Sequence, residues 1–89
     1  MTTIFEEAEE IVQGARQKFY GAPDENHGRT AIMWSAYLDR TVTAEDVCML
    51  NILQKVSRGR HSLTRDTLVD IAGYARNIEI IQEAKTDGK

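Results

Sequence analysis

Residues 47–56 form a stretch that is apolar on almost every side of the helix it predicts. Little polar surface is left among Cys48, Met49, Leu50, Ile52 and Leu53. A helix that is hydrophobic all round is normally buried in the centre of a bundle or in an interface. The chain has only 89 residues, which is one domain, so few neighbouring helices are available to cover it. We therefore expect a homo-oligomer.

Apolar residues recur at helical spacing in four segments, and no segment alternates as a strand does. A residue that favours helix N-termini stands before each segment, namely Thr3, Asp24, Thr43 and Thr64. The segments end near residues 21, 38, 56 and 84, and residues 58–62 are expected to form a basic turn. The predicted fold class is all-α, a compact bundle of about four helices. Residues 1–89 make a single domain, with residues 84–89 as a frayed tail.

The overall charge and the lone cysteine exclude several classes of protein. A net charge of −3 argues against general binding to DNA or RNA, which usually requires a basic domain. Cys48 has no second cysteine to pair with, and we expect it to be a small core residue. No apolar run is long enough for a membrane span, and the acidic N-terminal residues do not resemble a signal peptide. We expect a soluble intracellular protein without a membrane partner.

Two carboxylates, Asp66 and Asp70, lie one turn apart in the last predicted helix. Such side chains share a face, with Cβ atoms about 5–6 Å apart, so they repel unless a cation neutralises them. Mg²⁺ suits this position, because it is bound by one or two carboxylates together with waters and phosphate oxygens. Alternatively, Asp66 stabilises the helix N-terminus and Asp70 pairs with a basic side chain. The sequence leaves both interpretations open.

A glycine follows these carboxylates inside the same helix. Gly73 costs the helix about 1 kcal/mol relative to alanine, which suggests a specific reason for its presence. Without a Cβ, it admits either a ligand or the backbone of a tightly packed helix. Its neighbour Tyr74 offers a flat ring and a hydroxyl to a ligand, or packs in the core with that hydroxyl satisfied.

The segment from residue 16 to residue 26 gathers basic and aromatic side chains around a turn set by Gly21 and Pro23. Side chains suited to an anionic ligand are Arg16, Lys18, Tyr20, Asn26, His27 and Arg29. Arginine binds phosphate through two parallel hydrogen bonds, and the free N–H groups at the start of the next helix also suit an anion. The alternative is a solvated helix end whose Tyr20 and Pro23 hold the loop onto the bundle.

Lys55 is the basic residue best placed to act across the bundle. Because it follows the apolar stretch, its stem is expected to be buried, and its ammonium group to neutralise Asp66 or Asp70. His27 and His61 have no second histidine or cysteine at metal-binding spacing, so no zinc site is predicted. The sequence also has no phosphate-binding loop, dinucleotide fingerprint or Ser-His-Asp arrangement.

Three motifs give the chain a resemblance to a known family. They are R-Q-K-F-Y-G-A-P-D-E-N at residues 16–26, A-I-M-W-S-A-Y-L at residues 31–38 and D-T-L-V-D-I-A-G-Y-A at residues 66–75. With Val47 to Lys55 and Arg58 between them, the chain resembles small uncharacterised proteins encoded mainly by bacteriophages and prophages. The resemblance covers roughly residues 5–84. It implies a phage origin, an all-helical fold and a location in the cytoplasm of the bacterial host.

The acidic residues give a second resemblance, to the all-α MazG-type nucleotide pyrophosphohydrolases. In that family, acidic pairs on two helices hold Mg²⁺ against a nucleoside triphosphate. The resemblance implies Asp66 and Asp70 as one pair and the E-x-x-E pairs of residues 6–10 as the other. This chain has D-x-x-x-D where the family has E-x-x-D, and its E-x-x-E pairs lie at the start of the first helix. The metal-binding set therefore looks incomplete.

Two hypotheses about function follow from these residues. In the first, the protein binds a nucleotide and, if the carboxylates hold Mg²⁺, hydrolyses it as a pyrophosphohydrolase. The ligand-binding residues would be Arg16, Lys18, Tyr20, Asn26, Arg29, Lys55 and Tyr74, with Asp66 and Asp70 at the metal. In the second, a non-catalytic phage accessory protein binds a host protein or sequesters a small nucleotide signal. For nucleotide binding, residues 16–26 and 66–74 must meet in one pocket.

Overall fold

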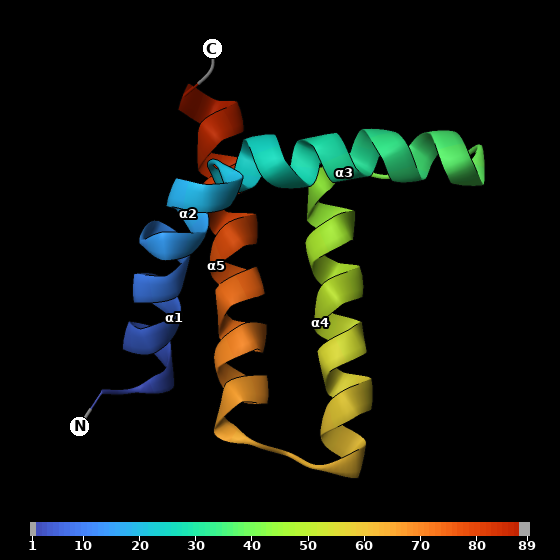
Figure 1. The fold of residues 1–89 in the computed structure, drawn as a ribbon. Coiled ribbons are helices and arrows are strands. Elements are labelled where there is room, and N and C mark those ends of the chain that lie inside the picture. Colours follow the sequence, from blue (N-terminus) through green and yellow to red (C-terminus); the bar gives the residue numbers. More distant parts are fainter. Residues whose placement is uncertain (1, 88–89) are drawn as a thin grey trace.

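The computed structural model describes residues 2–87, and this range contains five helices and no strand (Figure 1). In chain order they are α1 (Ile4–Gln13), α2 (Ala15–Tyr20), α3 (Pro23–Leu38), α4 (Ala44–His61) and α5 (Arg65–Asp87). The predicted all-α class is confirmed. One helix more than expected is present, because the first predicted helix is divided at Gly14. Helix α5 also continues through residues 84–87, which we had expected to fray, whereas residues 88–89 of that tail lie outside the described range.

Thr3 and Thr43 precede α1 and α4 as the sequence predicts, and each forms a capping box. The hydroxyl of Thr3 accepts from the N–H of Glu6 at 3.1 Å, and the Glu6 carboxylate accepts from the N–H of Thr3 at 3.0 Å. Thr43 and Asp46 make the same reciprocal pair before α4. Backbone N–H donors, followed by the threonine hydroxyls, lower the pKa of both carboxyl groups. These local bonds fix where the two helices start.

Two helix boundaries differ from the prediction. Helix α3 begins at Pro23, with Ala22 as its N-cap, so Asp24 lies in the first turn instead of capping it. Proline is favoured there because its missing N–H would have no helical partner. Helix α4 runs on to His61, so the expected basic turn at residues 58–62 is largely helical. Its basic side chains lie in the last turn, where the helix dipole favours cations.

Helix α5 lies between α1 and α4, and α3 crosses the ends of α4 and α5 (Figure 1). The central position of the bundle therefore belongs to α5, whereas α4 packs against it through one face. The second half of α3 extends past α4 in the same view. Tyr37 and Leu38, at the end of that helix, are exposed, Tyr37 to 89%.

The core is small and lies mainly along α5, where α1 packs on one side and α4 on the other. Its buried apolar side chains are those of Ala8, Val12, Ala31, Val47, Cys48, Val69 and Ile81. Burial, with a smaller effect of Glu45, raises the pKa of the Cys48 thiol to about 12, so Cys48 is the inert core residue that the sequence predicts. Among residues 2–87, no helix combines the length and apolarity that a membrane span requires.

Candidate functional site

A break at Gly14 determines where α2 lies. Gly14 has φ −99° and ψ −115°, which is outside the helical region, and its N–H donates to the carbonyl of Glu10 at 2.8 Å. A Cβ at this position would lie 2.5 Å from the same carbonyl oxygen, closer than a side chain can come. Glycine therefore allows α2 to leave in a new direction, and this brings Arg16 and Tyr20 toward α3 and α5.

The turn after α2 is held by Gly21 and Arg29. Gly21 has φ +86°, a left-handed conformation that favours glycine. A guanidinium nitrogen of Arg29 donates to the carbonyl of Tyr20 at 3.2 Å, so this expected ligand residue also closes the turn. Pro23 is buried against the bundle, whereas Tyr20 stays exposed. The turn is thus fixed by backbone geometry and one side chain, and Tyr20 is left accessible.

Two small adjoining cavities lie between α1–α2 and α5, each of about 30 Å³. Both are lined by Val12, Arg16 and Asn77. The first is also lined by Asp70, Gly73 and Tyr74, and the second by Tyr20, Asn26 and His27. The two sequence phrases, residues 16–26 and 66–74, therefore meet in one cleft, which we call the α1–α5 cleft.

His27 and Asn77 make the polar contact between the walls of this cleft. The amide nitrogen of Asn77 donates to Nε2 of His27 at 3.2 Å, and the His27 ring lies 6.0 Å from the Tyr74 ring between centroids. Burial, and then the charge of Arg16, lower the pKa of His27. A neutral ring is also what the hydrogen bond requires, because a protonated Nε2 cannot accept. His27 is therefore a buried neutral acceptor, and the expectation of a cation at this position was wrong.

Lys55 and Asp70 form the ion pair that the sequence suggested. Their Nζ and Oδ2 atoms lie 3.1 Å apart, and the two side chains are 18% and 37% exposed. Lys55 comes from α4 and Asp70 from α5, so the pair joins the helices beside the cleft. Asp66 is exposed, lies in the first turn of α5 and lines neither cavity. Asp70 thus has a basic partner, and Asp66 has the location expected of a residue that stabilises the helix dipole.

Gly73 faces the cleft, and tight packing does not exclude a side chain there. A Cβ built on Gly73 would meet Cγ2 of Val12 at 3.7 Å, which is an ordinary van der Waals distance. The glycine is therefore not required by the contact between α1 and α5. A Cβ at this position would instead narrow the first cavity, which Gly73 lines.

The basic side chains near the turn differ in their surroundings. Arg16 lines both cavities and makes no ion pair within residues 2–87. Lys18 is exposed and lines neither cavity. Since His27 is neutral and Lys55 is paired with Asp70, Arg16 is the cation of the cleft that forms no ion pair with a described residue.

Asn77 is the residue that the sequence analysis missed. It lies one turn after Gly73 and two turns after Asp70, so all three share one face of α5. That spacing was visible in the sequence, but asparagine in a polar helix carries no specific signal until a partner such as His27 is known.

The acidic residues of the described chain offer little to a metal ion. Within residues 2–87, no group of three or more histidine, cysteine, aspartate or glutamate side chains lies close enough together to hold one. Asp66 and Asp70 supply two carboxylates at most, and the Lys55 ammonium group lies beside the second. An Mg²⁺ ion here would depend on waters and on phosphate oxygens of a ligand for its remaining contacts.

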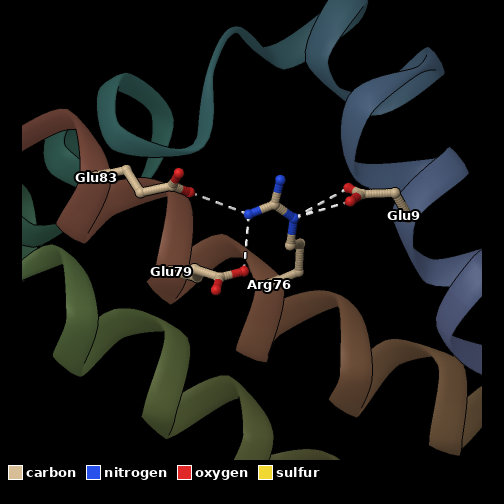
Figure 2. A network of polar contacts seen from close by, with 4 residues as sticks. All are labelled: Glu9, Arg76, Glu79 and Glu83. Carbon is tan, nitrogen blue, oxygen red and sulfur yellow. Dashed lines mark hydrogen bonds and ion pairs between the residues drawn. The ribbon is translucent and has the colours of Figure 1, made fainter. Parts of the chain in front are cut away.

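Elsewhere on α1 and α5, a second polar cluster surrounds Arg76 (Figure 2). Its Nε lies 3.0 Å from a carboxylate oxygen of Glu9, and its Nη1 lies 2.8 Å from Glu79 and 3.1 Å from Glu83. Hydrogen bonds, first to Glu9 and then to Glu83, raise the pKa of Arg76. The cluster borders an open groove of about 730 Å³. Three carboxylates around one guanidinium make this groove unsuited to phosphate, although it is much larger than the α1–α5 cleft.

Comparison with known proteins shows that this all-helical chain is similar to phage proteins. The model of a family described as a domain of unknown function, DUF6378, matches residues 3–82. The Gene 55 protein of Mycobacterium phage D29 is 40% identical over 91 residues, covering 98% of this chain and 58% of the relative. The Gene 55 protein of Mycobacterium phage L5 is 46% identical over 86 residues, covering 90% and 53%.

The chain thus spans a little more than half the length of these phage relatives. No solved structure matches it. The family match extends over nearly all of α1 to α5 and includes both walls of the α1–α5 cleft. On this match, the chain belongs to the DUF6378 family of phage-related proteins.

Proposed function

We propose that the α1–α5 cleft binds the phosphate end of a small ligand such as a nucleotide, and that the protein does not hydrolyse it. The observation that carries this proposal is the position of Arg16. Its side chain lines both cavities without an acidic partner among the described residues, next to the amide of Asn77. A guanidinium group in this situation favours a phosphate, to which it can donate two parallel hydrogen bonds.

The other groups of the cleft complement this cation. Asn26 and Asn77 offer amide groups to phosphate or sugar oxygens, and the neutral His27 adds no charge. Tyr20 is exposed at the edge of the second cavity, where its ring can stack on a base.

The size of the cavities limits how much of a ligand they enclose. About 30 Å³ is room for a few water molecules, whereas pockets that enclose a whole small molecule measure about 300–1,000 Å³. Only the phosphate end of a nucleotide would therefore lie inside, in place of water. The nucleoside would rest outside the cavities, against Tyr20.

The arrangement of carboxylates is the reason for proposing binding alone. Mg²⁺-dependent hydrolysis, which the MazG resemblance implies, needs carboxylates that hold an ion against the phosphates. Asp66 lines neither cavity and Asp70 is paired with Lys55. Arg16 can neutralise a phosphate without an ion, so the proposal needs no metal and derives no step through one.

Calorimetric titration tests the role of Arg16. Inorganic pyrophosphate and ATP are titrated into the wild type, Arg16→Ala and Lys18→Ala. We expect Arg16→Ala to weaken binding about tenfold to a hundredfold, which corresponds to the loss of hydrogen bonds to a charged group. Lys18→Ala is the matched control, since it removes a nearby exposed cation outside the cavities, and its affinity should stay within about threefold of the wild type.

A second measurement separates binding from hydrolysis. ATP and the deoxynucleoside triphosphates are incubated with the protein with and without Mg²⁺, and the nucleotides are quantified afterwards. Intact nucleotide in both samples supports the proposal. Mg²⁺-dependent loss of nucleotide that disappears in Asp70→Asn would establish the hydrolase instead. Unchanged affinity in Arg16→Ala, or no binding of either probe at millimolar concentration, would refute the proposed site.

A further inference from the structure

The folded chain exposes more surface than a monomer of its mass should. Its accessible surface is 6432 Å², whereas a folded monomer of 10.1 kDa is expected to expose roughly 5,300 Å². The excess is roughly 1,100 Å² by this comparison. A protein–protein interface of standard size buries about 800 Å² on each partner, so the excess is large enough for one complete interface.

Much of the exposed apolar surface lies along the outer face of α4. The four side chains of this stripe are Met49, Leu50, Leu53 and Val56, and between 46% and 60% of each is exposed. On the opposite face of α4, Val47 and Cys48 are buried and Lys55 pairs with α5. The apolar stretch of α4 thus has one face covered by this chain and one face, the outer α4 stripe, that nothing in residues 2–87 covers.

Charged residues of opposite sign stand at the two ends of the outer α4 stripe. Asp46 lies about two turns before Leu53 and Arg60 about two turns after it, so all three share one face of the helix. Both charged side chains are exposed, and neither forms an ion pair with another described residue. Leu53 is therefore the midpoint of a stripe that is acidic at one end and basic at the other.

We infer that a second copy of this chain covers the outer α4 stripe, with the two α4 helices antiparallel about a twofold axis at Leu53. Such an axis places Leu53 against its own copy, Leu50 beside Val56 of the partner subunit, and Asp46 beside Arg60 of the partner subunit. The same surface of the two subunits is then in contact, as a closed twofold dimer requires. A parallel arrangement would instead bring Asp46 against Asp46 and Arg60 against Arg60, which like-charge repulsion disfavours.

The second half of α3, which projects past the start of α4, offers further exposed apolar surface at that end of α4. It passes the start of α4 in Figure 1 and carries exposed Ile32, Met33, Tyr37 and Leu38. Helices α1 and α2 lie on the side of α5 away from α4. The proposed dimer therefore leaves the α1–α5 cleft open. Dimerisation does not depend on ligand binding in the cleft, so the two proposals can be tested separately.

Sedimentation equilibrium at micromolar concentrations tests the dimer and its interface. We expect about twice 10.1 kDa for the wild type and a monomer for Leu53→Lys. Phe19→Lys is the matched control, because it places the same charge at an exposed apolar position on α2, and it should remain a dimer. Circular dichroism of each variant shows whether the helices are retained. A monomeric wild type, or a Leu53→Lys variant that stays dimeric, would overturn the inference.

Charge reversal tests the antiparallel orientation. Arg60→Glu and Asp46→Arg each place like charges together twice across the proposed axis, so each should raise the dissociation constant about tenfold or more. A mixture of the two variants restores an acid opposite a base at both positions and should dimerise like the wild type. Simple misfolding cannot produce this restoration. If the mixture associates no better than the separate variants, the antiparallel α4 pairing is wrong.

Discussion

Replacing Gly73 by alanine tests whether the glycine is required for packing of α1 on α5 or for the cavity that it lines. The structure leaves room for the new methyl group, since its nearest atom outside the local helix backbone would be Cγ2 of Val12 at 3.7 Å. Alanine should therefore gain its usual helical advantage of about 0.8–1.0 kcal/mol over glycine. The same methyl group would narrow the cavity that Gly73 lines.

Gly28→Ala is the matched control for this experiment. Gly28 also lies inside a helix, α3, and a Cβ there would have no neighbour within 4 Å. It lines neither cavity of the α1–α5 cleft. In urea unfolding, both variants should be more stable than the wild type by about 1 kcal/mol, which is a rise of about 4–8 °C in the melting temperature for a chain of this length.

The two glycine variants should differ only in binding. Calorimetry with pyrophosphate should show weakened binding for Gly73→Ala and unchanged binding for Gly28→Ala. If Gly73→Ala is less stable than the wild type, then packing of α1 on α5 requires the glycine and the reasoning from the 3.7 Å distance is refuted. If Gly73→Ala is stabilised and binds pyrophosphate like the wild type, then the cavity beside Gly73 takes no part in binding.

Three further predictions concern the turn, a cap and a buried histidine. Gly21→Ala should lower the free energy of unfolding by about 1–2 kcal/mol in urea titration, because φ is +86° there; no loss would mean that the turn readjusts. Thr43→Ala should cost about 1 kcal/mol by the same measurement, since it removes the capping box of α4. Because burial lowers the pKa of His27 from 6.5, the unfolded chain takes up a proton first, so wild-type stability should fall as pH drops below about 6.5. His27→Gln should flatten this fall between pH 7 and pH 5.5, and an equally steep fall would contradict the assignment.

Features governed by local rules could be predicted from the sequence. Thr3 and Thr43 were predicted to stand before the first and third helices, and both are the N-caps of α1 and α4. Lys55 lies near the end of the apolar stretch, and it has the buried stem and the ion pair with Asp70 that were expected. We also predicted one pocket shared by residues 16–26 and 66–74. The two cavities lie between these segments, in agreement with that prediction.

Features that depend on contacts between distant helices could not be predicted. Glycine is tolerated within helices, so only the actual backbone shows that Gly14 divides the first helix. His27 seemed a cation until α5 covered it and lowered its pKa, and Asn77 gained meaning only as its hydrogen-bond donor. The composition of α4 left open whether the helix lies at the centre of the bundle or in an interface, because composition does not say whether its second apolar face is covered by this chain or by another.

In the proposed mode of binding, the two walls of the α1–α5 cleft recognise one ligand together. Amide chemical-shift mapping by NMR during a titration with ATP tests this most directly. We expect the largest shifts, saturating with one affinity, to belong to residues from both walls, namely Arg16, Asn26, His27, Gly73, Tyr74 and Asn77. Shifts confined to one wall, or centred on the outer α4 stripe or the Arg76 cluster, would contradict it.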